Sequence, residues 1–236
     1  MSDAMTPVTL ENLAERLLAA AENRRRLVVA LAGPPGVGKS TTAEHLVALL
    51  NEGKPGRASI LPMDGYHLDD IVLNERGHRP RKGAPFTFDL DGLAAMLQRL
   101  RAEPPRDVAV PVFDRSIEIA RAGARIVEAR TGIVVVEGNY LLLDEPGWRD
   151  LRGLFDVTVM LVASETALEA RLTERWQGFG LEGEAMVTKM EGNDLPNMRL
   201  VLRNSLPADY ALSTETESNT RGAASKRRLD LDTKKP

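Results

Sequence analysis

The sequence predicts an α/β fold, a doubly wound, mostly parallel sheet with helices on both faces. Three observations support this expectation. Short apolar runs without polar alternation, such as Leu27–Ala32, are typical of strands buried on both faces of a parallel sheet. Segments with apolar residues at helical spacing lie between these runs, and such alternation favours parallel strands with right-handed crossovers. The length of 236 residues fits one domain of this kind.

The expected elements follow one another in this alternation. Thr9 is a suitable N-cap for a first helix, because apolar residues recur at helical spacing from Leu10 to Ala21. The apolar runs Ile133–Val136 and Val157–Val162 predict further buried strands. The other expected helices are Lys39–Leu50, Asp91–Ala102, Ser164 to about Trp176, Glu182–Met190 and Met198–Asn204, and the other expected strands are Ser59–Met63, Val108–Phe113 and Ala208–Leu212.

Two segments depart from this regularity. The connection Asp64–Phe88 is long and dense in Gly, Pro and charge, and such connections in small domains are usually functional or disordered. Residues 213–236 contain few large apolar side chains, so burial there cannot offset the entropy of ordering. We therefore expect a single domain over residues 1–212, with a disordered polar tail over 213–236.

Composition excludes several classes of protein. There are no cysteines, which excludes disulfides and thiolate metal sites. Lys and Arg number 31 against 34 acidic residues, so no basic field indicates a nucleic-acid partner. No apolar run approaches the roughly 20 residues that cross a bilayer, and the N-terminus lacks a signal pattern. These features favour a cytoplasmic protein without a membrane partner; whether it forms a homodimer is left open.

One motif makes the prediction specific. Residues 33–40 match G-x-x-x-x-G-K-[ST] between a buried strand and a helix, the context of a P-loop NTPase. Glycines let backbone N–H groups turn toward a polyphosphate, the lysine offers a charge, and the serine hydroxyl can ligate Mg²⁺. A Gly/Pro turn capped by Lys-Ser is the disfavoured alternative. The predicted nucleotide-binding residues here are Gly33, Pro34, Pro35, Gly36, Val37, Gly38, Lys39, Ser40 and Thr41.

Two acidic residues follow predicted strands. Glu137 comes directly after a buried strand, where it could help Ser40 to hold Mg²⁺, or serve only as a turn or capping carboxylate. Asp64 follows the strand Ser59–Met63, where an ionised carboxylate could accept the proton of an acceptor hydroxyl. Simple Asp-Gly turn chemistry is the alternative for Asp64. The sequence has neither the Asn-Lys-x-Asp guanine motif nor an ABC-type signature.

These motifs resemble those of the P-loop kinases that include uridine kinase, phosphoribulokinase and bacterial pantothenate kinase. Met63-Asp64-Gly65-Tyr66-His67 is similar to the family's strand end whose Asp is the catalytic base. Gly83–Asp89 resembles a segment whose Asp binds acceptor hydroxyls, and Val110–Asp114 resembles a strand beside the acceptor pocket. The run Glu137–Leu143 is also similar to bacterial proteins labelled fructose transport system kinase. The resemblance extends from the P-loop to about Tyr210.

The resemblance implies roles for further residues. Arg171 and Arg175 match lid arginines, in a helical lid over about 171–196, and Asn193 falls in a nucleotide-side segment. Two departures weaken a pyrimidine nucleoside as acceptor: uridine kinases carry Ser where this chain has Gly65, and their base-reading pattern is not reproduced around Arg115–Arg121. The acceptor-binding residues that we expect are Tyr66, His67, Arg81, Lys82, Phe88, Asp89, Arg115 and Tyr140.

Several of these residues have a second interpretation. Arg171 and Arg175 lie four apart on one helix face, so they could clamp the γ-phosphate or pair with neighbouring glutamates in solvent. Asp89 could bind hydroxyls or occupy the N-terminal turn of a helix. The basic stretch Arg76–Lys82 could recognise an anionic acceptor, balance the charge of ATP, or be solvated. Trp148 and Trp176 are expected to be packing residues.

Together these features predict a kinase that transfers the γ-phosphoryl group of Mg-ATP to a hydroxyl of a small metabolite, with a sugar such as fructose favoured. In this prediction Asp64 is the base, Lys39, Arg171 and Arg175 assist transfer, and Ser40 and Glu137 hold the metal. A pantothenate- or nucleoside-type kinase is the closest alternative. A regulatory ATPase acting through a protein partner is an alternative from another class. The sequence does not identify the acceptor or distinguish ATP from GTP.

Overall fold

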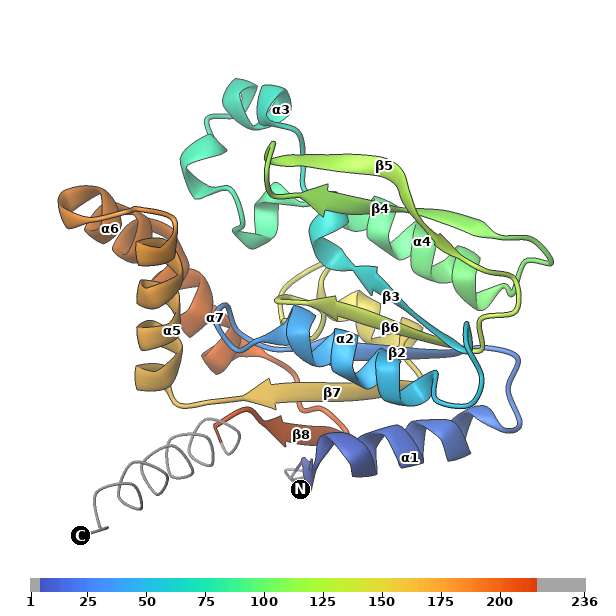
Figure 1. The fold of residues 1–236 in the computed structure, drawn as a ribbon. Coiled ribbons are helices and arrows are strands. Elements are labelled where there is room, and N and C mark those ends of the chain that lie inside the picture. Colours follow the sequence, from blue (N-terminus) through green and yellow to red (C-terminus); the bar gives the residue numbers. More distant parts are fainter. Residues whose placement is uncertain (1–4, 216–236) are drawn as a thin grey trace, which may run out of the picture.

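The computed structural model describes residues 5–215. Six parallel strands in this range form the central sheet, in the order β1-β8-β7-β2-β6-β3 (Figure 1). The predicted doubly wound α/β fold is therefore confirmed, and every pairing in this sheet is parallel. The strands are β1 Thr6–Val8, β2 Leu27–Ala32, β3 Ala58–Pro62, β6 Ile133–Gly138, β7 Val157–Val162 and β8 Tyr210–Ser213.

Helices cover both faces of this sheet because its central strands are apolar on both. Along β2 the side chains alternate: Val29 and Leu31 pack with α1, α2 and α5 on one face, and Val28 and Ala30 pack with α4 on the other (Figure 1). No helix in residues 5–215 is long and apolar enough to cross a membrane. The helices are α1 Leu10–Ala21, α2 Lys39–Leu50, α3 Asp70–Glu75, α4 Leu90–Arg101, α5 Glu165–Gly178, α6 Gly183–Lys189 and α7 Leu195–Asn204.

The strand expected over Val108–Phe113 lies outside the central sheet. It is β4 (Val108–Asp114), which pairs antiparallel with β5 (Ile119–Val127) to form a separate hairpin above α4 (Figure 1). β5 was missed because most of its residues are small or charged and exposed, so no apolar pattern marks it. The short edge strand β1 was also missed.

The connection Asp64–Phe88, which we call the acceptor segment, contains more regular structure than its composition suggests. It includes α3 and parts of three 3₁₀ turns, Met63–Tyr66, Arg79–Arg81 and Pro85–Thr87. The amide of Leu68 donates to the carbonyl of Thr87 at 3.0 Å, which closes the segment at its base. Gly and Pro here terminate short turns rather than prevent them.

The end of the chain is ordered slightly beyond the expected limit at residue 212. Ser213 ends β8, and Thr214 and Glu215 hydrogen-bond to Arg171 and Ser164 respectively. The rest of the predicted disordered tail, residues 216–236, lies outside the described residues. Beside the carboxyl ends of the strands, α5, α6, a π turn over Met190–Asp194 and α7 form a helical projection, which we call the lid (Figure 1).

Candidate active site

The P-loop is fixed by the strand before it and the helix after it. β2 is fully buried between β6 and β7, so the following loop begins at the centre of the sheet edge. Gly36 and Gly38 have φ of 83° and 89°, a region that favours glycine. Gly38 is also the N-cap of α2 and offers no side chain to cap it, so N–H groups of the first turn remain available to an anionic ligand.

Lys39 folds back over this loop. Its Nζ donates to the carbonyl of Pro34 at 3.0 Å, and desolvation lowers the pKa of Lys39 to about 8. A lysine with a lowered pKa and one neutral hydrogen-bond partner is strongly attracted to a polyphosphate, which would supply the missing negative charge.

Glu137 and Ser40 meet beside the lysine. The Oγ of Ser40 donates to Oε1 of Glu137 at 3.4 Å, and only 7% of Glu137 is exposed. Burial, and secondarily the nearby Asp64 carboxylate, raise the pKa of Glu137 to about 7. A hydroxyl and a carboxylate oxygen are ligands of the type that Mg²⁺ takes alongside phosphate and water. The pair therefore fits a magnesium ion at the P-loop.

Asp64 faces the P-loop across one cleft of about 520 Å³. β3 neighbours β6, which neighbours β2, so the ends of these three strands bring Asp64, Glu137 and Lys39 to the same edge of the sheet. Oδ2 of Asp64 accepts from Nη2 of Arg115 at 2.7 Å. The predicted residues that line this cleft are Pro35, Gly36, Gly38, Lys39, Ser40, Thr41, Asp64, His67, Lys82, Phe88, Arg115, Glu137, Arg171, Arg175 and Asn193.

Gly65 is required by close backbone packing rather than by its φ. A Cβ at this position would lie 2.5 Å from the carbonyl oxygen of Pro111 on β4. The turn that presents Asp64 therefore lies directly against the hairpin. This contact gives a physical reason for the absence here of the serine found in uridine kinases.

His67 and Phe88 form the apolar part of the wall next to Asp64. The His67 ring lies 4.1 Å from the Phe88 ring and 4.7 Å from the Phe113 ring, between centroids. Its Nδ1 is 2.8 Å from the backbone oxygen of Asp64, and burial lowers the pKa of His67. A neutral imidazole in this position donates to the Asp64 carbonyl and holds the turn.

Three residues expected to bind the acceptor do not line this cleft. Asp89 is the N-cap of α4, and its Oδ1 accepts from the amide of Gly92 at 2.9 Å, which is the alternative that the sequence left open. Tyr140 is fully buried, and its hydroxyl donates to the carbonyl of Gly83 at 2.6 Å. Tyr66 is buried as well, and no partner for its hydroxyl lies within residues 5–215. None of the three lines the cleft.

Arg81 does not line the cleft either, and Asn193 lines it with its side-chain amide already bonded to other residues. Arg81 donates from Nε to Asn193 and from Nη2 to Asn197, both at 3.3 Å. Asn193 lines the cleft, but its amide is bonded to Lys82 and Asn197.

Three of the predicted P-loop residues do not line the cleft. Gly33 and Val37 pack beneath the loop, where a Cβ on Gly33 would lie 2.9 Å from Cγ1 of Val37. Pro34 lines a neighbouring apolar pocket.

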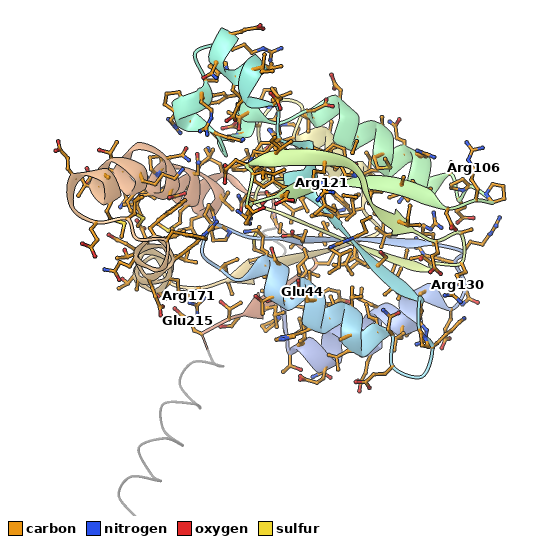
Figure 2. The ribbon with its side chains drawn as sticks, turned by 45° about the horizontal axis from the view of Figure 1, so that its top comes forward. Glu44, Arg106, Arg121, Arg130, Arg171 and Glu215 are labelled. Atoms are coloured by element: carbon orange, nitrogen blue, oxygen red, sulfur yellow. The ribbon has the colours of Figure 1, made fainter. Side chains whose placement is uncertain are left out.

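The two lid arginines differ in their surroundings. Arg171 donates to Oγ1 and the carbonyl of Thr214, at 2.9 and 3.0 Å, so it is not the solvent-facing residue of the alternative interpretation. Figure 2 shows it on α5 close to Glu215. Arg175 lies 5.3 Å from the centroid of the Trp176 ring and lines the cleft.

A second cavity of about 460 Å³ adjoins the P-loop on its other side. It shares Gly36, Gly38, Thr41 and Arg171 with the main cleft. Its remaining wall is formed by residues 8–11, from the end of β1 into α1, and by residues 212–214 at the end of β8, together with Val37, Thr42 and His45.

Several cleft residues were not singled out as site residues by sequence reasoning. Asn139 follows Glu137-Gly138 directly, so its place after a strand could have indicated it. Trp176 was expected only to pack; it lines the cleft, and its Nε1 donates to Oδ2 of Asp194 at 2.6 Å. Trp148, by contrast, is 4% exposed and packs in the core as expected. Arg79, Gly83 and Phe113 lie in segments that the sequence analysis had associated with the acceptor, although none of them was proposed individually. The remaining lining residues are Glu118, Phe179, Lys189, Asp194 and Asn197.

Comparison with known proteins agrees with this geometry. The model of the phosphoribulokinase / uridine kinase family matches residues 28–186. A protein of Schizosaccharomyces pombe named as a putative uridine kinase is 30% identical over 217 residues, which cover 89% of this chain and 92% of the relative. The pantothenate kinase of Listeria monocytogenes serotype 4a is 31% identical over 158 residues, 66% of this chain and 51% of the relative.

A solved structure, named as a putative fructose transport system kinase from Silicibacter sp. TM1040, is 44% identical to this chain. It superposes with a TM-score of 0.80 and covers 87% of this chain and 98% of its own. The matched family region contains the P-loop, Asp64 and Glu137. The chain is therefore a kinase that belongs to the phosphoribulokinase / uridine kinase family.

Proposed function

We propose that this kinase transfers the γ-phosphoryl group of Mg-ATP to a hydroxyl of a small polar metabolite, with a sugar such as fructose as the favoured acceptor. The observation that carries the proposal is that the Asp64 carboxylate and the P-loop line the same cleft. Phosphoryl transfer requires mainly positioning and electrostatic stabilisation, both of which this arrangement offers.

In this proposal the P-loop amides and Lys39 hold the phosphates, and Ser40 and Glu137 hold Mg²⁺. The metal would neutralise negative charge on the β- and γ-phosphates when it is bound. Arg175 is placed at the lid side of the cleft, where its guanidinium can approach the transferred group. Asp64, Glu137 and Lys39 thus have separate tasks on neighbouring strand ends.

Asp64 would act as the base. The acceptor hydroxyl loses its proton to the Asp64 carboxylate while its oxygen forms a bond to the γ-phosphorus. The bond between the γ-phosphorus and the β–γ bridging oxygen breaks, and ADP leaves with that oxygen. The 2.7 Å bond from Arg115 orients one carboxylate oxygen and leaves the other for the acceptor.

The second cavity fits the nucleoside end of ATP. It continues from the P-loop glycines and has an arginine at its junction with the cleft. Arg171 is held there by two hydrogen bonds to Thr214, and a planar guanidinium of this kind stacks on aromatic rings. We therefore assign Arg171 to the nucleoside rather than to the γ-phosphate.

The pairing of charges near Asp64 favours an uncharged acceptor. Arg79 and Lys82 both bond to Asp70, at 2.6 Å each, and Arg115 bonds to Asp64. Because each of these cations already has an acidic partner, a carboxylate or phosphate on the acceptor would have to displace one. A sugar such as fructose is favoured as acceptor because the 44% identical structure is named as a putative fructose transport system kinase. Pantothenate, suggested by the Listeria relatives, is the second candidate.

An assay of ADP release tests the proposal. The panel contains fructose and other sugars, pantothenate, nucleosides and sugar phosphates. Asp64→Asn should lower kcat with the best acceptor by about 10²-fold or more and leave ATP affinity close to wild type. Asp91→Asn, an exposed carboxylate in the first turn of α4, is the matched control and should be silent. Full activity of Asp64→Asn, or ATP consumption stimulated only by a macromolecule, would exclude the proposed reaction.

A further inference from the structure

Two neighbouring residues of the π turn, Asn193 and Asp194, hold opposite walls of the cleft. Asn193 bonds to the acceptor segment, and Asp194 bonds to the lid helix α5. We propose that this pair couples the two walls, so that a nucleotide bound beneath the lid also orders the acceptor segment. The inference rests on the proposed function and makes Asn193, Asp194 and Trp176 positioning residues.

The bonds of Asn193 use both ends of its amide. Nδ2 donates to the carbonyl of Lys82 at 2.9 Å, while Oδ1 accepts from Arg81 at 3.3 Å and from Asn197 at 3.1 Å. Asn193 is 4% exposed and Asn197 3% exposed, so the bonds from Asn193 to Lys82 and from Asn197 to Asn193 are buried and costly to break. The position of the π turn therefore fixes the backbone at residues 81–82.

Lys82 extends this constraint to the rest of the acceptor wall. Its Nζ donates to Oδ1 of Asp70 at 2.6 Å and to the carbonyl of Glu118 at 2.7 Å, and it lies 5.1 Å from the centroid of the Phe113 ring. Glu118 has a φ of 57°, a left-handed conformation that L residues adopt only at an energetic cost. The hairpin end thus depends on contacts such as this one, and Lys82 joins it to α3.

Asp194 makes the corresponding connection on the lid side. Its Oδ2 accepts from Nε1 of Trp176 at 2.6 Å. Two cations lie near the Trp176 ring, Lys189 at 4.9 Å and Arg175 at 5.3 Å from its centroid. A movement of α5 that places Arg175 over a phosphate would therefore carry Trp176 and, through the hydrogen bond, Asp194.

The π turn makes the two connections inseparable. Asn193 and Asp194 share a peptide bond, so a displacement of one reaches the other without an intervening flexible residue. π turns are uncommon and often mark functional sites, because the wider turn is retained where side chains must point in particular directions. Coupling of this kind is reciprocal, so the acceptor should also tighten nucleotide binding.

Hydrogen exchange with a non-hydrolysable ATP analogue, Mg-AMP-PNP, tests the coupling without an acceptor. The probe amides are those of Lys82, Ala84 and Thr87, which donate within the acceptor segment at 2.9–3.1 Å. In the wild type the analogue should slow exchange both in the P-loop and at these amides. Trp176→Phe retains a ring but loses the N–H donor. In this variant the analogue should still slow exchange in the P-loop, whereas the slowing of exchange in the acceptor segment should be smaller than in the wild type by about tenfold or more.

Further variants separate the hydrogen bond from other causes. Asn193→Ala should behave as Trp176→Phe does, whereas Asp194→Asn, which still offers an oxygen to Trp176, should retain the coupling. Asn204→Ala, an exposed residue at the end of α7, is the control and should match the wild type. If Asn193→Ala fails to fold, Trp176→Phe and Asp194→Asn still decide the question.

The possible results distinguish the two proposals. If the analogue slows exchange in the P-loop but never in the acceptor segment of the wild type, the coupling is wrong and the proposed function stands. If Trp176→Phe retains the acceptor-segment effect, the route through Asp194 is also wrong. If the analogue protects neither region, the proposed nucleotide site itself fails, and the coupling fails with it.

Discussion

The lowered pKa of Lys39 makes a quantitative prediction for nucleotide binding. Because the pKa of Lys39 in the protein without nucleotide is about 8, most molecules carry a neutral Lys39 above that pH. Polyphosphate binds the charged form. Apparent affinity should therefore fall by a factor of about 1 + 10^(pH−8), which is about tenfold, or about 1.4 kcal/mol, between pH 7 and pH 9.

The same ionisation predicts a proton balance. Binding raises the pKa of Lys39, so each bound nucleotide should take up about 0.5 proton at pH 8 and about 0.9 at pH 9. Titration calorimetry with Mg-AMP-PNP in two buffers of different ionisation enthalpy measures this uptake directly. The phosphates of the ligand have lost their protons well below this range, so they do not contribute.

Lys39→Arg is the matched variant. An arginine stays charged throughout, so its affinity should be independent of pH between about 7.5 and 9.5, with no proton uptake. A wild-type affinity that is constant to pH 9.5, or an equal pH dependence in Lys39→Arg, would refute the assignment of a desolvated lysine at the phosphate site.

Three further predictions concern other parts of the molecule. Arg26 is 7% exposed and donates to the carbonyls of Leu100, Glu128, Ala129 and Thr131. Arg26→Ala should therefore lower the free energy of unfolding in urea by about 3–5 kcal/mol, against at most about 1 kcal/mol for the exposed Arg25→Ala, and equal values would contradict this role. Gly65→Ala should destabilise by about 1–3 kcal/mol and lower kcat, because its Cβ would overlap Pro111; wild-type stability and kcat would show that the hairpin yields freely. Glu137, with a pKa of about 7, should bind Mg²⁺ less well as pH falls below that value, measured as the Mg²⁺ concentration for half-maximal turnover; a constant requirement from pH 8 to 6 would argue against Glu137 as ligand.

The elements best predicted from sequence are those whose local signals and burial agree. β2 and α2 have the bounds that their patterns indicated, because an unbroken apolar run and a P-loop each admit one arrangement. The hairpin strand β5 could not be found in this way. It pairs on one side only and exposes most of its residues, and only Val127 at its end is buried, where it joins Val108 and Val110 of β4 in the core. The apolar contacts that hold the hairpin therefore leave no pattern along β5 itself.

The residues of the candidate site also differ in how clearly the sequence marks them. The positions of Asp64 and Glu137 were predictable because Glu137 ends a buried strand and Asp64 lies in the turn after one. Lys39 and Ser40 begin the helix after the P-loop, and parallel strands bring all four residues to one edge of the sheet. The role of Asp89 was harder to predict, since the same residue type caps a helix or binds a hydroxyl, and the 2.9 Å bond to Gly92 shows only that Asp89 caps α4.

The position of Lys39 and Glu137 at one edge of the sheet also explains why we expect their ionisation to respond to ligands. In the protein alone, burial disfavours both the charged form of Lys39 and that of Glu137, which brings their pKa values to about 8 and about 7. Desolvation is therefore incurred when the chain folds, before any ligand binds. A nucleotide returns charge to Lys39, and a metal ion returns it to Glu137, so each ligand relieves a cost that folding has imposed. Lys39 and Glu137 therefore destabilise the sheet edge in the protein alone, and the same two groups make it selective for a metal–polyphosphate. We expect saturating Mg-AMP-PNP to raise the Tm more than the same nucleotide without Mg²⁺ does.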